Sequence, residues 1–262
     1  MSSFTLAILS SGFTFLCTVL GAALVFFLGS SKKILLTQLS LGVSAGIMIS
    51  ASVFGLLIPA QKEAFASGSG LFSVAGGFVL GVLFIIALDR SLPHLHMLAR
   101  VPEGPKTTLG KRTLLFLAIT IHNIPEGMAV GVCAAAATED LKGGIGALIA
   151  LAVGIGIQNI PEGTAVSLPY YAEGASRLKA FALGSLSGIV EPAGAVLVVL
   201  FSSVVVQLLP WFLSFAAGAM LYVVIEELIP ESHNMGNKES DLATVSVLSG
   251  FLLMMVLDVA LG

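Results

Sequence analysis

The chain has 262 residues, of which 56% are hydrophobic and 10% are charged, and its mean hydropathy is +1.03. Soluble domains carry about 25% charged residues, so this composition excludes a water-soluble globular protein and indicates an integral membrane protein whose surroundings are the lipid bilayer. The formal net charge of −3 provides no basic surplus for binding nucleic acid, which is therefore not expected as a partner.

Eight windows are long and apolar enough to cross a bilayer, since a spanning helix needs about 20 mainly apolar residues. Their runs are continuously apolar and lack the alternation of a membrane barrel, so we predict an all-α protein with a single transmembrane domain over residues 1–262. The sixth break is the weakest, because it depends only on Gln207 and Pro210. The expected spans cover residues 4–28, 36–60, 70–90, 113–137, 144–170, 178–201, 206–231 and 242–261.

The charges between these windows indicate their orientation. Lys32 and Lys33 follow the first window instead of preceding it, which indicates a retained span with an outside N-terminus and not a cleaved signal peptide. Ten of the 12 Lys and Arg residues then lie on the cytoplasmic side, as the positive-inside rule expects, and Lys62 and Lys142 lie outside. Both termini are thus expected outside. The absence of a targeting extension suits a multi-pass protein of a prokaryotic cell (cytoplasmic) membrane.

Two pairs of glycines mark places where helices are expected to approach each other closely. Gly77 and Gly81 are four residues apart in the third window, and Gly184 and Gly188 have the same spacing in the sixth. Small residues with this spacing are typical of helix contacts within membranes, where they let two backbones approach.

Three acids lie near the centres of their windows, namely Glu126, Glu162 and Glu191. An acid at a helix centre costs about 2.5–3.5 kcal/mol on insertion scales, and no Lys or Arg lies near the window centres to offset it. Protons, water or a bound cation must compensate. Protonated glutamates that hydrogen-bond between helices would be a purely structural alternative.

Two of these acids belong to a repeated motif. "IHNIPEGMAV" at residues 121–130 returns as "IQNIPEGTAV" at residues 157–166. Each residue of an α-helix advances by about 100°, so Glu126 lies in direction between His122 and Asn123, one turn further along. Gln158, Asn159 and Glu162 have the same spacing, and each motif therefore presents one group of ligands on one side of its helix.

The fourth and fifth spans run antiparallel, so the two motifs are expected to be related by a pseudo-two-fold axis in the membrane plane, as in inverted-repeat transporters. Facing each other, they could hold two adjacent cations bridged by Glu126 and Glu162. Pro125 and Pro161 are expected to bend the helices and to free a carbonyl beside each ligand group. "VEPAG", which contains Glu191, would supply a third wall.

One imidazole, several carboxylates and several amide oxygens form this ligand set. Zn²⁺, Fe²⁺, Mn²⁺, Co²⁺ and Cd²⁺ all accept such ligands, and the sequence does not choose among them. His122 counts against Ca²⁺ and Mg²⁺, which prefer oxygen alone.

The sequence with these motifs resembles the ZIP metal-transporter family. "HNIPEG" in the fourth span and "NIPEG" in the fifth are similar to that family's two signature helices, and the resemblance covers essentially the whole chain. It implies import of divalent transition metal, most often zinc, toward the cytoplasm, with the metal as transported substrate and without a cofactor. It also implies that spans 1, 4, 5 and 6 move against spans 2, 3, 7 and 8, and that a homodimer can form.

The resemblance further implies two adjacent metal positions. "AGIMISAS" in the second span is similar to the family segment that contributes a methionine to the first position. The first position would use Met48, His122, Glu126, Gln158 and Glu162, and the second would use Asn123, Glu126, Asn159, Glu162 and Glu191.

The sequence departs from the family pattern at three places. Many relatives have a second histidine where this chain has Gln158, and some have an aspartate at Asn159, so the affinity and charge of the two positions are open. A histidine-rich loop is common between spans three and four, whereas this chain offers only His94 and His96 there.

A second group of residues could form an exit path for metal or protons on the cytoplasmic side. Ordinary solvent exposure of the histidines, solvation of the acids, or local pairing of Asp89 with Arg90 are alternative interpretations. The candidates are Asp89, His94, His96, Glu226, Glu227, Glu231 and His233.

Two other functions would use similar buried ligands. An intramembrane metal-dependent hydrolase is disfavoured because the sequence has no HExxH motif and only one histidine in the cluster. A metal sensor would need an output domain, and the longest loop has about 22 residues. We therefore expect a transporter and not an enzyme.

Overall fold

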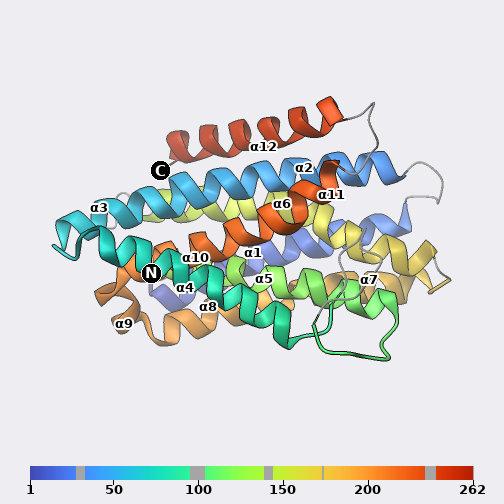
Figure 1. Cartoon of the computed structure of the whole chain (residues 1–262), viewed down its shortest axis with the longest axis horizontal. Coiled ribbons are helices and arrows are strands. Elements are labelled where there is room, and N and C mark those ends of the chain that lie inside the picture. The colour runs from blue at the N-terminus through green and yellow to red at the C-terminus, as the bar shows by residue number, and fades with distance from the viewer. Residues whose placement is uncertain (28–32, 95–103, 139–143, 173, 234–239, 262) are drawn as a thin grey trace.

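The computed structural model describes residues 1–27, 33–94, 104–138, 144–172, 174–233 and 240–261 as a bundle of long helices (Figure 1). Within these ranges all regular structure is helical, and eight helical segments have the length and composition to cross a membrane. The all-α fold and its eight spans are thus confirmed. The segments are Ser3–Phe26, Leu39–Ala66, Gly70–Ser91, Phe116–Ala136, Gly144–Ala172, Arg177–Leu200, Leu209–His233 and Asp241–Leu261.

Half of the spans are single helices and half are composed of shorter elements. The single ones are α4 (Gly70–Ser91), α5 (Lys111–Ala136), α6 (Gly144–Ala172) and α12 (Ser240–Leu261). The composite ones are α1 (Ser3–Ala23) with η1 (Leu24–Phe26); α2 (Lys33–Ser50) with η2 (Ala51–Leu57) and α3 (Ile58–Ala66); α7 (Arg177–Leu186) with η3 (Ser187–Ile189) and α8 (Val190–Leu200); and α10 (Leu209–Val223) with η4 (Val224–Leu228) and α11 (Ile229–His233).

Two boundaries differ from the sequence prediction. The second span continues to Ala66 instead of ending at residue 60, because Lys62 and Glu63 extend the helix and the turn begins only at Ser67. The weak sixth break is real, but it holds a separate short helix, α9 (Ser202–Gln207), before Pro210 enters the first turn of α10. A proline is well suited to a first turn, where its missing N–H leaves no bond unmade.

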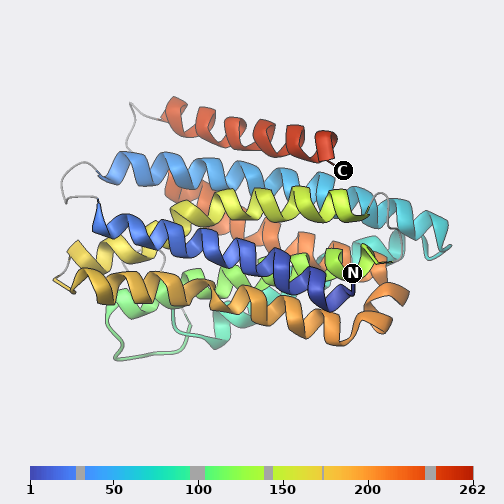
Figure 2. The same cartoon turned by 180° about the vertical axis from the view of Figure 1, so that it is seen from behind.

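The helices form two groups, which we call the first and the second bundle. In the first bundle, α1 packs along α6 and α5 packs along α8. In the second, α2 packs along α12 and α4 packs along α10, and Figures 1 and 2 show α12 lying beside α2 at one edge of the molecule. These are the two groups of spans that the family resemblance implied. The two termini lie at the same end of the molecule in both views.

Glycines allow the tightest of these contacts. A Cβ added to Gly81 would collide with the carbonyl oxygen of Phe215, and one added to Gly218 would collide with that of Phe78, so α4 and α10 meet backbone to backbone. A Cβ on Gly188 would lie 2.9 Å from Thr18 Oγ1 of α1. The close approach predicted for the third and sixth spans is therefore confirmed.

The prolines of the repeated motifs do not interrupt their helices. Pro125 lies inside α5, and Pro161 and Pro169 lie inside α6, each within a continuous α-helix. In the sixth span, in contrast, the 3₁₀ segment η3 leads directly into α8, which contains Pro192. The motif prolines thus lie within regular α-helices, whereas the third proline lies beside a 3₁₀ turn in a continuous helical span.

Candidate functional site

The motif side chains lie in the interior of the molecule, although most are polar or acidic. The residues of the two motifs come from α5 and α6, and Glu191 comes from the first turn of α8. Each of the following side chains belongs to a residue that is at most 6% exposed: His122, Asn123, Glu126, Gln158, Asn159, Glu162 and Glu191.

One hydrogen bond joins the two motifs directly. Gln158 Nε2 donates to Glu126 Oε1 over 2.6 Å, and this contact links α6 to α5. The orientation of the amide follows from it, since its NH₂ group faces the carboxylate. At this point the two groups of predicted ligands do face each other.

The two asparagines make equivalent hydrogen bonds to the backbones of two different spans, the first and the sixth. Asn159 Nδ2 donates to the carbonyl oxygen of Thr14 on α1 over 3.1 Å, and Asn123 Nδ2 donates to that of Ser187 in η3 over 3.1 Å. The NH₂ groups of both amides therefore donate to the protein backbone. Their carbonyl oxygens remain available to accept from, or to coordinate, another partner.

Glu191 is hydrogen-bonded by side chains of two other helices, namely Thr14 and Thr18 of α1 and Asn159 of α6. Thr18 Oγ1 donates to its Oε1 over 3.1 Å, and Asn159 Nδ2 donates to its Oε2 over 2.8 Å. Glu191 lies just after the 3₁₀ segment η3 within one helical span, and Pro192 accounts for a local change of hydrogen bonding there, since it cannot donate to the carbonyl of Gly188.

Five buried oxygen atoms of the predicted ligands have no hydrogen-bond partner among the described residues. Leaving such an atom unpaired costs about 1–3 kcal/mol, so their gathering in one region requires an explanation. The atoms are Asn123 Oδ1, Glu126 Oε2, Gln158 Oε1, Asn159 Oδ1 and Glu162 Oε2.

Acid and imidazole groups alone do not enclose an ion in this conformation. In the part of the chain that the structure describes, no three His, Cys, Asp or Glu side chains come together as a metal site. The unpaired oxygens belong to three amides and two acids, so amides contribute as much as carboxylates to what this region offers a cation.

His122 makes its contact across the two bundles. Its Nε2 lies 2.5 Å from Glu227 Oε1, and both side chains are nearly buried. Glu227 belongs to η4, a π-helical segment of the seventh span, and such segments are frequent at functional sites. The sequence predicted Glu227 only as an exit-path residue, whereas the structure brings it against the central histidine.

Asp89 lines a cavity at the end of α4, and His94 lies close to Asp89. His94 is fully buried, its Nδ1 lies 2.9 Å from the carbonyl oxygen of Leu92, and its Nε2 lies 3.9 Å from Asp89 Oδ1. Ordinary solvent exposure is therefore wrong for His94. The cavity measures about 550 Å³, and Asp89, Arg90, Tyr222 and Glu226 are among its lining residues. His96 lies outside the described residues.

The remaining exit-path candidates lie at the end of the seventh span. Glu231 is 8% exposed. His233 bonds locally, with its Nδ1 2.9 Å from the carbonyl oxygen of Ile229 and its Nε2 3.3 Å from Thr244 Oγ1 on α12. These contacts make His233 a link between α11 and α12.

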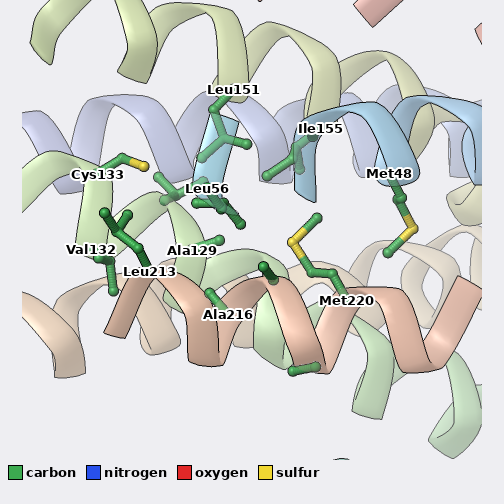
Figure 3. Close-up of a cluster of buried hydrophobic side chains, with 14 of the residues drawn as sticks. Met48, Leu56, Ala129, Val132, Cys133, Leu151, Ile155, Leu213, Ala216 and Met220 are labelled. Atoms are coloured by element: carbon green, nitrogen blue, oxygen red, sulfur yellow. The ribbon is translucent and has the colours of Figure 1, made fainter. Parts of the chain in front are cut away.

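Met48 packs in the apolar core. It is 1% exposed and belongs to the same cluster of buried hydrophobic residues as Met220 and Ile155, which Figure 3 shows in close-up. Its contribution to the first metal position therefore stays a prediction of the family resemblance.

Sequence reasoning missed the hydroxyl groups of the first span. Ser11, Thr14 and Thr18 are fully buried, and they recur at spacings of three and four residues, which places them on one side of α1. This pattern could have indicated a polar stripe that faces the site. A hydroxyl of the second span also contacts a motif residue, since Ser44 Oγ donates to the carbonyl oxygen of Gln158 over 3.2 Å.

Comparisons with known proteins agree on one family. The family model described as "ZIP Zinc transporter" matches residues 103–258. The chain is 36% identical to "Zinc transporter ZIP11" of Homo sapiens, with 100% of this chain and 98% of that protein covered. It is 44% identical to "Zinc transporter GufA" of Myxococcus xanthus (84% and 85% covered) and 40% identical to "Zinc transporter ZIPB" of Bordetella bronchiseptica (98% and 81%).

Proposed function

Because the chain belongs to the ZIP family of zinc transporters, we propose that it carries divalent transition-metal ions, zinc foremost, through the membrane toward the cytoplasm. ZIP proteins are transporters and not enzymes, so the metal is cargo. Its eight spans make this a multi-pass membrane protein, and close bacterial relatives support a bacterial cell membrane as its location.

The five unpaired buried oxygens are the observation that carries this proposal. They belong to residues of both predicted metal positions, and a divalent cation is the partner that satisfies carboxylate and amide oxygens together. His122 would add the nitrogen that favours zinc over purely oxygen-seeking ions. In this proposal Glu126 and Glu162 bridge two adjacent cations between spans 4, 5 and 6.

Repeated contacts support an inverted repeat around this site. The bond from Asn123 to the backbone of Ser187 has its counterpart in the bond from Asn159 to the backbone of Thr14. The second and seventh spans each contain a π-helical segment, and each segment leads into the tripeptide Leu-Ile-Pro, at residues 57–59 and 228–230. We propose that span 1 corresponds to span 6, span 2 to span 7, span 3 to span 8 and span 4 to span 5.

The cavity beside Asp89 supports an exit toward the cytoplasmic end. Acidic side chains line it, and Glu227 connects its neighbourhood to His122. A metal that leaves the central site would pass Glu227 and then Asp89 and Glu226. Motion of one bundle against the other, and pairing of two copies in the bilayer, belong to the same proposal.

Zinc flux into proteoliposomes tests the function. Wild-type protein should show saturable Zn²⁺ uptake, and the double variant Glu126→Ala/Glu162→Ala should lose it. Glu63→Ala is the matched control, because Glu63 is an exposed acid at the end of the second span. Full uptake by the folded double variant would refute the central site, and an absence of uptake by folded wild-type protein would refute the transport of zinc.

A further inference from the structure

Thr18 is a polar residue of the first span that no part of the function assigned above uses. It is fully buried, and its hydroxyl donates to Glu191 Oε1 over 3.1 Å while also lying 3.4 Å from the carbonyl oxygen of Thr14. The other oxygen of Glu191 accepts a hydrogen bond from Asn159 Nδ2, which also donates to the carbonyl oxygen of Thr14. These contacts form a closed ring that joins α1, α6 and α8.

Packing fixes the position of Thr18 from two sides. A Cβ added to Gly163 of the second motif would collide with the carbonyl oxygen of Thr18. A Cβ added to Gly188 of η3 would lie 2.9 Å from Thr18 Oγ1 and 3.0 Å from its Cβ. The two glycines let α1 pack against α6 and against η3, so the hydroxyl has little freedom to move away from Glu191.

Thr18 also stands where the repeat would place the counterpart of Glu191. Gly127 of the first motif abuts the backbone of Glu191, just as Gly163 of the second motif abuts the backbone of Thr18. Thr18 and Glu191 are 173 positions apart, and the same separation relates Thr14 to Ser187, the two backbone acceptors of the motif asparagines. Thr18 is therefore the first-span counterpart of Glu191.

We propose that Thr18 is a positioning residue of the second metal position. Its hydroxyl holds Glu191, Glu191 holds the NH₂ group of Asn159, and Asn159 Oδ1 is thereby kept turned toward the cation. This inference rests on the proposed function, since it concerns the metal that the site carries. In the described structure both carboxylate oxygens of Glu191 accept hydrogen bonds, so this predicted ligand also orients Asn159.

Thr18→Val tests this role, because valine keeps the branched shape that fits against Gly188 and removes only the hydroxyl. We expect the zinc concentration for half-maximal flux to rise about tenfold, the usual consequence of losing a hydrogen bond to a charged group. The maximal flux should change by less than about twofold, because the moving helices keep their packing. Thr18→Ser should restore the wild-type value, which a purely steric role would not predict.

Thr164→Val is the matched control. Thr164 Oγ1 donates to the carbonyl oxygen of Gly21 over 2.9 Å, so it joins the same helices α6 and α1 without contacting a predicted ligand. The zinc concentration for half-maximal flux through Thr164→Val should stay at the wild-type value. An unchanged half-maximal concentration in Thr18→Val, or an equal rise in Thr164→Val, would overturn the assignment.

Equilibrium dialysis of the purified full chain with Zn²⁺ separates this inference from the transport proposal. If wild-type protein binds zinc but carries none across the membrane, import fails, and weaker binding by Thr18→Val still supports the positioning role. If Thr18→Val does not fold, Thr18→Ala compared with Thr18→Ser decides the question, since only the serine keeps the hydroxyl. Equal zinc binding by the alanine and serine variants would refute the role of the hydroxyl.

Discussion

The amides of the site each perform two tasks. Their NH₂ groups bind protein acceptors, as Gln158 does toward Glu126 and Asn159 toward Glu191, while their oxygens have no partner among the described residues. An acid at the same place could not donate, and it would add charge to a site that already holds three acids. Asparagine and glutamine therefore let neighbouring carboxylates lie close together without a Lys or Arg between them.

Replacing one amide by its acid should expose this balance. Asn159→Asp removes the donor to Glu191 and places two carboxylates side by side, so the metal-free protein should melt at a lower temperature than wild type. Added Zn²⁺ should stabilise the variant more than wild type, because a cation relieves the repulsion and binds only the folded state. Thermal unfolding with and without Zn²⁺ measures this effect.

Gln207→Glu provides the control for that experiment. It makes the same chemical change at an exposed residue of α9, remote in sequence from both motifs. Its melting temperature and its zinc response should equal those of wild type. An identical zinc response in Asn159→Asp would contradict the assignment of Asn159 to a metal position.

Gln158 offers a test of metal choice. Gln158→His exchanges an amide oxygen for an imidazole nitrogen, and nitrogen ligands favour Zn²⁺ over Mn²⁺. We expect Zn²⁺ to compete more strongly against Mn²⁺ in the variant than in wild type, measured as the concentration of Mn²⁺ that halves Zn²⁺ uptake. A variant more sensitive to Mn²⁺ would argue against Gln158 as a ligand of the first position.

At the scale of the helices, sequence and structure agree where local signals suffice. Hydropathy predicts the eight spans because a bilayer demands a minimum apolar length, and the repeated motif predicts that Gln158 and Glu126 meet. The π-helical segments were not predictable, because their hydrogen-bond register depends on neighbouring helices. The contact of Glu227 with His122 was missed for that reason, since η4 alters which side chains of the seventh span point inward.

The motif glycines determine how closely the site helices pack. Gly163→Ala would push its methyl group into the backbone of Thr18, which cannot move without shifting α1. We expect this variant to lose about 1–3 kcal/mol of stability, as overpacked cores do, and to melt at a lower temperature. Gly12→Ala is the control, because nothing lies within 4 Å of the added methyl group. Equal melting temperatures for both variants would contradict the tight contact.

At the scale of the whole molecule, an even number of spans places both termini on one side, and Figure 1 shows them at one end of the bundle. Which side that is follows only from the distribution of basic residues. The ten-to-two split of Lys and Arg predicts that the ends of the chain lie outside. The orientation of the chain in the bilayer can be measured directly.

Labelling of single cysteines from one side of the membrane supplies that measurement. In a background with Cys17→Ser and Cys133→Ser, a membrane-impermeant maleimide added to intact cells should label Ser2→Cys and Leu261→Cys. Ser176→Cys, an exposed position at the start of α7, should be labelled only after the membrane is opened. Labelling of Ser176→Cys in intact cells would show that the chain has the opposite orientation, and it would contradict the proposed direction of transport.

The contact between His122 and Glu227 has a consequence for how metal binding and helix motion are connected. A ring nitrogen engages one partner at a time, either a carboxylate through its N–H or a metal ion through its lone pair, so a metal ion that binds Nε2 of His122 must displace Glu227, which belongs to the other bundle. On the proposed function, an empty carrier keeps its two bundles tied together and a loaded one has to release them. Because a carrier returns empty after each delivery, the contact between His122 and Glu227 would have to open and re-form once in every cycle, and its partner change from Glu227 to metal would mark the loaded state.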